Sequence, residues 1–112
     1  MAVIPFPSCR FTPADLAAFY EVALPKCSRG SWAGVARQTG RHHDRLLISL
    51  PGVIEPVFVF ERDVSGHYRL WFKDSDGGRC IGTGTTAAAC LGIWQPASAR
   101  RRERVPAAVP VR

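Results

Sequence analysis

The alternation of apolar and polar side chains is strongest in residues 56–84, where it predicts three β-strands joined by two tight turns. The first turn, Asp63–Gly66, begins with an aspartate suited to a type I turn and ends with a glycine suited to left-handed backbone. The second turn is centred on Asp76-Gly77, a pair that tolerates a positive φ at both positions. Together the turns predict an antiparallel meander and fix its register.

Each turn determines which residues lie opposite each other on neighbouring strands. Across the first hairpin the predicted pairs are Phe58 with Phe72, Val59 with Trp71, Phe60 with Leu70, Glu61 with Arg69, and Arg62 with Tyr68. Across the second hairpin they are Trp71 with Gly82, Phe72 with Ile81, and Lys73 with Cys80. Because side chains alternate between faces with a period of two, this register gives the sheet two chemically different faces.

One face is apolar and is the predicted core face: Phe58, Phe60, Tyr68, Leu70, Phe72 and Ile81. The other face carries a basic and aromatic stripe on the middle strand, beside the neighbouring strand's Val57, Val59 and Glu61: His67, Arg69, Trp71 and Lys73. A register shifted by one residue would bury Arg69 and Lys73 without partners and would expose three phenyl rings. The cost of burying those charges excludes it.

Apolar residues at helical spacing predict two helices that pack on the core face. The first spans Pro13–Leu24, with Thr12 as its N-cap, and Pro25 is expected to end it. The second spans Thr86–Ile93. Its packing side is expected to consist of Ala87, Ala88, Cys90, Leu91 and Trp94.

Two further strands are predicted before the meander, over Ser31–Gln38 and Arg45–Leu50, with the loop Gly40–Asp44 between them. Gly34 is expected to mark a bulge or a close contact. The predicted fold is therefore α+β: an antiparallel meander of four or five strands, with an N-terminal and a C-terminal helix on one face. Residues 1–94 are expected to form a single domain.

The positive charge is concentrated after Gln95. That segment holds five arginines and one glutamate, a net +4 of the chain's +6, together with three prolines. This composition predicts a disordered basic tail over residues 95–112. The start of the chain lacks the apolar run of a signal peptide, and no stretch has the length of a membrane span, so a cytoplasmic location is expected. There the widely spaced cysteines would be free thiols: Cys9, Cys27, Cys80 and Cys90.

The sequence offers no convincing catalytic, metal or cofactor site. His42, His43 and Asp44 are adjacent in the chain, but a metal site would need a further ligand from elsewhere. Cys80 and His67 share a face yet lie roughly 20 Å apart along the strands, too far for a nucleophile and its base. The glycines of residues 82–87 follow an antiparallel strand, whereas a dinucleotide-binding loop needs a parallel unit. We therefore expect a protein that is not an enzyme.

Residues 68–94, YRLWFKDSDGGRCIGTGTTAAACLGIW, resemble the three-stranded sheet and helix of integrase arm-binding domains and of plant ethylene-response-factor DNA-binding domains. In both families a hairpin with glycine in its turn leads to an alanine-rich helix behind the sheet. The resemblance implies that Arg69, Trp71 and Lys73 meet DNA. Glu61 departs from that pattern, because an acid on the reading face repels phosphate.

The leading hypothesis is non-enzymatic nucleic-acid binding, with double-stranded DNA as the partner. The stripe His67, Arg69, Trp71 and Lys73 would supply phosphate contacts and a stacking group. Sequence-independent phosphate contacts would come from Arg100, Arg101, Arg102 and Arg104. Two alternatives use the same face: a small protein-binding module, an inhibitor or adaptor anchored on Trp71, or a homodimer.

Overall fold

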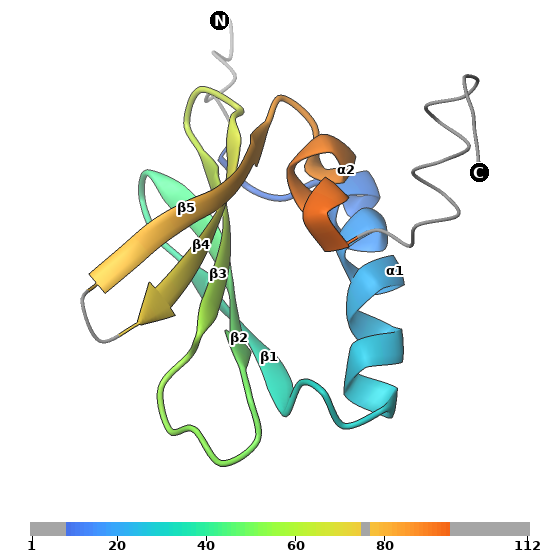
Figure 1. Cartoon of the computed structure of the whole chain (residues 1–112). Helices are drawn as coiled ribbons and strands as arrows, with labels where there is room; N and C mark the ends of the chain where they lie inside the picture. Colours follow the sequence, from blue (N-terminus) through green and yellow to red (C-terminus); the bar gives the residue numbers. More distant parts are fainter. Residues whose placement is uncertain (1–8, 75–76, 95–112) are drawn as a thin grey trace, which may run out of the picture.

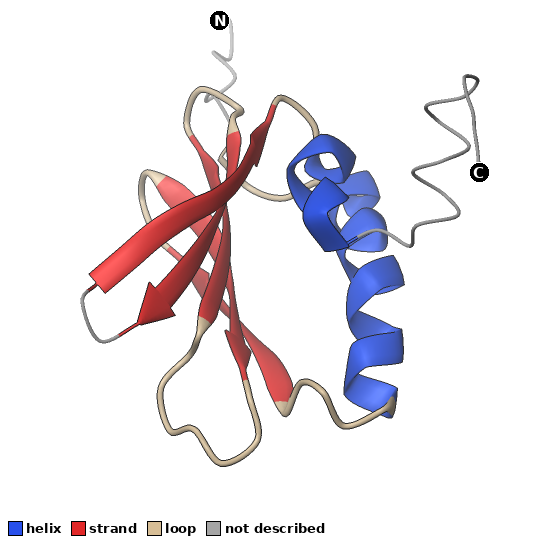
Figure 2. Cartoon of the chain, in the orientation of Figure 1, coloured by secondary structure: helices blue, strands red, loops and turns tan. Residues whose placement is uncertain are grey.

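The chain folds into one antiparallel sheet with helices on a single face, as the computed structural model shows for residues 9–74 and 77–94 (Figures 1 and 2). The sheet has five strands in the order of the sequence: β1 (Gly34–Thr39), β2 (His43–Ser49), β3 (Phe58–Asp63), β4 (Tyr68–Asp74) and β5 (Gly77–Gly84). The long helix α1 (Pro13–Ser28) and the short helix α2 (Ala87–Cys90) cover it, and the 3-10 turn η1 (Leu91–Trp94) follows α2. The predicted α+β meander is confirmed. The tail, residues 95–112, lies outside the described residues.

Helix α1 begins where the sequence predicted and ends one turn later. Thr12 caps it, since its hydroxyl accepts a hydrogen bond from Asp15 N–H at 3.0 Å and the Asp15 carboxylate accepts one from Thr12 N–H at 2.9 Å. The expectation that Pro25 ends the helix is wrong. Pro25 is exposed and lies near the C-terminal end of α1, so its missing N–H costs the helix only one hydrogen bond. The helix continues past it, and the Pro25 carbonyl accepts a hydrogen bond from Arg29 N–H at 3.0 Å.

The two strands that precede the meander are confirmed, with shifted bounds. Residues 31–33 are not in β1, because Trp32 is buried in the core and its N–H donates to the Lys26 carbonyl. Gly34 marks neither a bulge nor a close contact: it pairs regularly with Ser49, and nothing lies within 4 Å of the position of an added Cβ. The predicted loop Gly40–Asp44 is shorter, since β2 already begins at His43.

The register of the β3–β4 hairpin is confirmed at all five predicted pairs. The predicted register of β4 with β5 is wrong by two residues: Cys80 lies opposite Trp71, Arg79 opposite Phe72 and Gly78 opposite Lys73. Gly77, with a φ of 113°, pairs with Asp74 and so ends the turn instead of forming its centre. A bulge between Leu70 and Trp71 absorbs part of the difference. Because the shift is even, Cys80 still lies on the same face of the sheet as Trp71.

The core lies between the sheet and the helices, as predicted. Phe60 is fully buried at its centre and stacks on three rings, with centroid distances of 5.1 Å to Phe11, 5.5 Å to Phe19 and 6.0 Å to Tyr68. The predicted core face is confirmed, although three of its six members are only half-buried: Phe58, Phe72 and Ile81.

The C-terminal helical segment begins at the predicted place, but its α-helical part is shorter than predicted. Thr86 accepts a hydrogen bond from Ala89 N–H at 3.1 Å, and the α-helix then tightens into a 3-10 turn at Leu91. The assignment of Ala88 to the packing side is wrong, because Ala87 and Cys90, three residues apart, share the buried side of this single turn. Ala88 is therefore exposed.

Candidate binding groove on the outer face of the sheet

The face of the sheet away from the helices, here called the outer face, carries two rows of residues that cross all five strands. Successive members of each row are paired in register. The apolar row consists of Ala36, Leu47, Val59, Trp71 and Cys80. The charged row lies beside the apolar row, two residues away along β1 to β4 and three residues away along β5. It consists of Gln38, Arg45, Glu61, Arg69 and Thr83. The outer face is thus apolar in one band and ionic in the next.

The three central residues of the apolar row form the floor of a groove of about 920 Å³. Leu47, Val59 and Trp71 lie on this floor. One wall is the β2–β3 loop, which contributes residues 53–57 except Ile54, and the opposite wall is the β4–β5 hairpin with Lys73, Asp74, Gly77 and Gly78. Figure 1 shows these two walls as separate projections from the sheet. The Arg45 and Glu61 side chains, with Gln38, close the inner end of the groove.

The charged row is held by ion pairs within the sheet. Arg45 Nε lies 2.9 Å from Glu61 Oε1, and Arg69 Nη1 lies 3.9 Å from Glu61 Oε2 and 2.7 Å from Asp63 Oδ2. Arg69 thus contacts both Glu61, the residue predicted to lie opposite it, and Asp63. The hydrogen bond that Arg69 donates to the Asp63 carboxylate raises the pKa of Arg69 above its usual value. Because Glu61 and Asp63 already neutralise its charge, Arg69 is a poorer candidate for binding phosphate.

The four residues of the predicted stripe fall into three environments. Trp71, which is half-buried, and Lys73, which is exposed, line the groove. Arg69 belongs to the charged row. His67 lies outside the groove at the β3–β4 turn. Its ring Nδ1 is 2.9 Å from Ser65 Oγ, and its backbone N–H donates a hydrogen bond to the Asp63 carboxylate at 3.1 Å. The other predicted contacts lie outside the described residues: Arg100, Arg101, Arg102 and Arg104.

The β3–β4 turn brings a serine, a histidine and an aspartate together, a combination that the sequence analysis did not consider. Ser65 Oγ donates to Asp63 Oδ1 at 2.6 Å. In a hydrolytic triad the carboxylate orients the histidine, and the histidine takes the proton of the serine. Here the carboxylate binds the serine hydroxyl itself. Burial alone would raise the pKa of Asp63, but hydrogen bonds from Ser65, Arg69 and the turn amides outweigh it and lower that pKa. The arrangement stabilises the turn.

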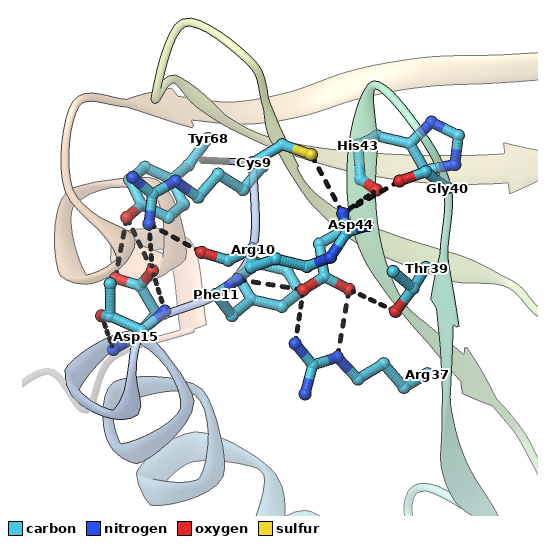
Figure 3. A network of polar contacts seen from close by, with 12 residues as sticks. Cys9, Arg10, Phe11, Asp15, Arg37, Thr39, Gly40, His43, Asp44 and Tyr68 are labelled. Carbon is cyan, nitrogen blue, oxygen red and sulfur yellow. Dashed lines mark hydrogen bonds and ion pairs between the residues drawn. The ribbon is translucent and has the colours of Figure 1, made fainter. Parts of the chain in front are cut away.

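Two buried carboxylates on the core side were also missed, and Figure 3 shows their network. Asp44 is completely buried and accepts hydrogen bonds from Arg37 Nε at 3.1 Å, Phe11 N–H at 2.9 Å and Thr39 Oγ1 at 3.3 Å. Burial opposes ionisation of Asp44, yet these donors outweigh it and hold its pKa below the usual range. The alternation of side chains along β2 could have predicted this burial, since Asp44 lies on the same inward face as Leu46 and Ile48.

The second buried carboxylate fixes the start of α1 to the sheet. Asp15 accepts hydrogen bonds from Tyr68 Oη at 2.8 Å and from Arg62 Nη1 at 3.0 Å. Burial and the hydrogen bond to Asp15 raise the pKa of Tyr68 to about 12. Together these contacts tie the first turn of α1 and the residues before it to strands β2, β3 and β4. Among the described residues, no group of three or more side chains is arranged to hold a metal ion.

Comparison of the chain with models of protein families, with curated proteins and with solved structures finds no match. The resemblance of residues 68–94 to DNA-binding domains therefore stays a prediction. In the part of the chain that the structure describes, neither helix combines the length and the apolar character that a membrane crossing requires. Cys9 and Cys90 are buried free thiols, whereas Cys27 is half-buried and Cys80 is exposed at the end of the apolar row.

Proposed function

We propose that this protein is a protein-binding module whose outer-face groove receives an apolar segment of a partner protein. The observation that carries the proposal is the position of Trp71. Its indole lies half-buried on the groove floor beside Leu47 and Val59, where a partner side chain could complete its burial. Tryptophans in partly enclosed apolar sites are the residues that most often dominate the affinity of protein interfaces.

The rim of the groove supports a macromolecular partner. Val53 and Ile54 of the β2–β3 loop are 45% and 96% exposed, and Ile54 lies outside the groove lining. A small molecule that filled the groove would leave Ile54 in water, whereas a protein surface can cover both. Within residues 9–74 and 77–94 the lining holds three acids and two bases, and this balance of charge does not favour a polyanion.

A photo-crosslinking experiment tests this function in the cells that make the protein. A photoreactive amino acid at position 54 is expected to capture a discrete protein, and Trp71→Ala is expected to lower the affinity for the captured protein about 30-fold. The matched control places the same amino acid at Leu24, which is 63% exposed on α1 on the helical side of the sheet. Equal capture at both positions, or capture unaffected by Trp71→Ala, would contradict the proposal.

Nucleic-acid binding is the second candidate, and the arginines of residues 100–104 favour it. Four basic residues in five positions would bind phosphate without sequence preference, and exposed Lys73 could add to them. A gel shift across about 50 to 500 mM salt should then show affinity falling steeply, with a smaller slope after deletion of residues 95–112. Affinity that is independent of salt, or no shift at any salt concentration, would eliminate this candidate.

A further inference from the structure

The mouth of the groove differs in charge from its inner end. At the inner end the Arg45 guanidinium and the Glu61 carboxylate neutralise each other across 2.9 Å. The mouth lies between the two walls, where Glu55 of the β2–β3 loop and Asp74 of the β4–β5 hairpin both line the groove. Among the described residues, Lys73 is the one base of the lining at this end, and the two acids exceed it. The apolar floor therefore lies between a neutralised ion pair at the inner end and an excess of acids at the mouth.

The spacing of these groups sets the length of chain that could contact both. Trp71 and Lys73 are two residues apart on β4, about 7 Å along the strand, and Asp74 is one residue further. An extended peptide covers the same distance in two to three residues. A side chain seated on Trp71 thus lies within a few residues of any side chain that reaches the acidic mouth.

We propose, building on the protein-binding function above, that the partner segment pairs an aliphatic or aromatic side chain with a lysine or arginine a few residues away. The apolar side chain packs on Leu47, Val59 and Trp71. The basic side chain faces Glu55 at the mouth, and Asp74 adds to its attraction. The partner is therefore an apolar segment with a positive flank, since an acidic flank would meet like charge.

Selection from a phage-displayed library of random peptides, with the full chain as bait, tests this pairing. Enriched peptides are expected to carry an apolar residue with a lysine or arginine a few residues away, and to lose binding to Trp71→Ala. Selection on Glu55→Lys is expected to remove the preference for the basic residue. For one enriched peptide, Glu55→Lys should weaken binding about fivefold to tenfold and Glu55→Gln by less, with smaller differences at high salt.

The outcomes separate this inference from the function beneath it. Enriched peptides that depend on Trp71 but show no basic residue would overturn the inference and leave the protein-binding function standing. Peptides that bind Trp71→Ala as well as the natural chain would overturn both. A dimer found by light scattering and dissociated by Trp71→Ala would make a second copy of the chain the occupant, and that result would also overturn the inference. Far-ultraviolet circular dichroism checks that each variant is folded.

Discussion

Replacing Asp44 with alanine is expected to lower the free energy of unfolding by about 2–3 kcal/mol, because three donors lose their acceptor and one of them, the Phe11 amide, is buried. Asp44 has no exposed surface, and its carboxylate holds three separate donors: the guanidinium of Arg37, the hydroxyl of Thr39 and the backbone amide of Phe11. Without it the Phe11 amide is left without its acceptor inside the protein. Urea unfolding, followed by tryptophan fluorescence, to which the buried Trp32 contributes, measures the loss.

The same carboxylate should make the stability depend on acid. Its pKa in the folded protein lies below the usual value, so its stabilising effect is complete above about pH 4 and disappears as the pH falls through the folded pKa. We expect the free energy of unfolding to decrease on acidification, and to decrease less in Asp44→Asn. Glu21→Gln is the matched control, because Glu21 is an exposed acid on α1. Equal acid sensitivity in Asp44→Asn and the natural chain would contradict this role.

Local turn chemistry explains why the first hairpin could be predicted and the second could not. The turn at Asp63–Gly66 contains one glycine, with a φ of 85°, so only one register places it correctly. The second turn is followed by two consecutive glycines, Gly77 and Gly78, and the sequence alone does not decide which of them ends it. The cross-strand contact of Arg79 with the Phe72 ring, at 5.4 Å, accompanies the observed register.

The candidate site was predicted only in part, for a reason of distance along the chain. Alternation within β4 was enough to place Trp71 and Lys73 on the outer face. The groove also requires Leu47 from β2 and the β2–β3 loop, whose contribution depends on the packing of the whole sheet. The burial of Asp44 was not predicted either. A charged residue next to two histidines suggests a loop, and Asp44 can be buried only because donors from β1 and from residue 11 reach its carboxylate.

The second large effect is expected at Gly82, where β5 passes directly beneath α2. A Cβ at this position would lie 2.6 Å from the Cys90 carbonyl oxygen and 3.5 Å from the Leu70 Cβ. The carbonyl belongs to the backbone of the helix and cannot rotate away, so Gly82→Ala must displace α2 or bend β5. The expected loss is about 2–3 kcal/mol of the free energy of unfolding, typical of overpacking in a core.

Displacement of α2 has a chemical signature at Cys90. This thiol is 1% exposed, and burial raises its pKa to about 12, so in the natural chain it should resist alkylation while the exposed Cys80 reacts. In Gly82→Ala, Cys90 should be alkylated faster relative to Cys80, as measured by mass spectrometry. The matched control is Gly34→Ala on β1, where an added Cβ has open space within 4 Å and both stability and Cys90 protection should be retained. Unchanged protection of Cys90 in Gly82→Ala would mean that β5, and not α2, yields to the added methyl group. Since Trp71 lies on the opposite face of the sheet, partner binding should survive either way.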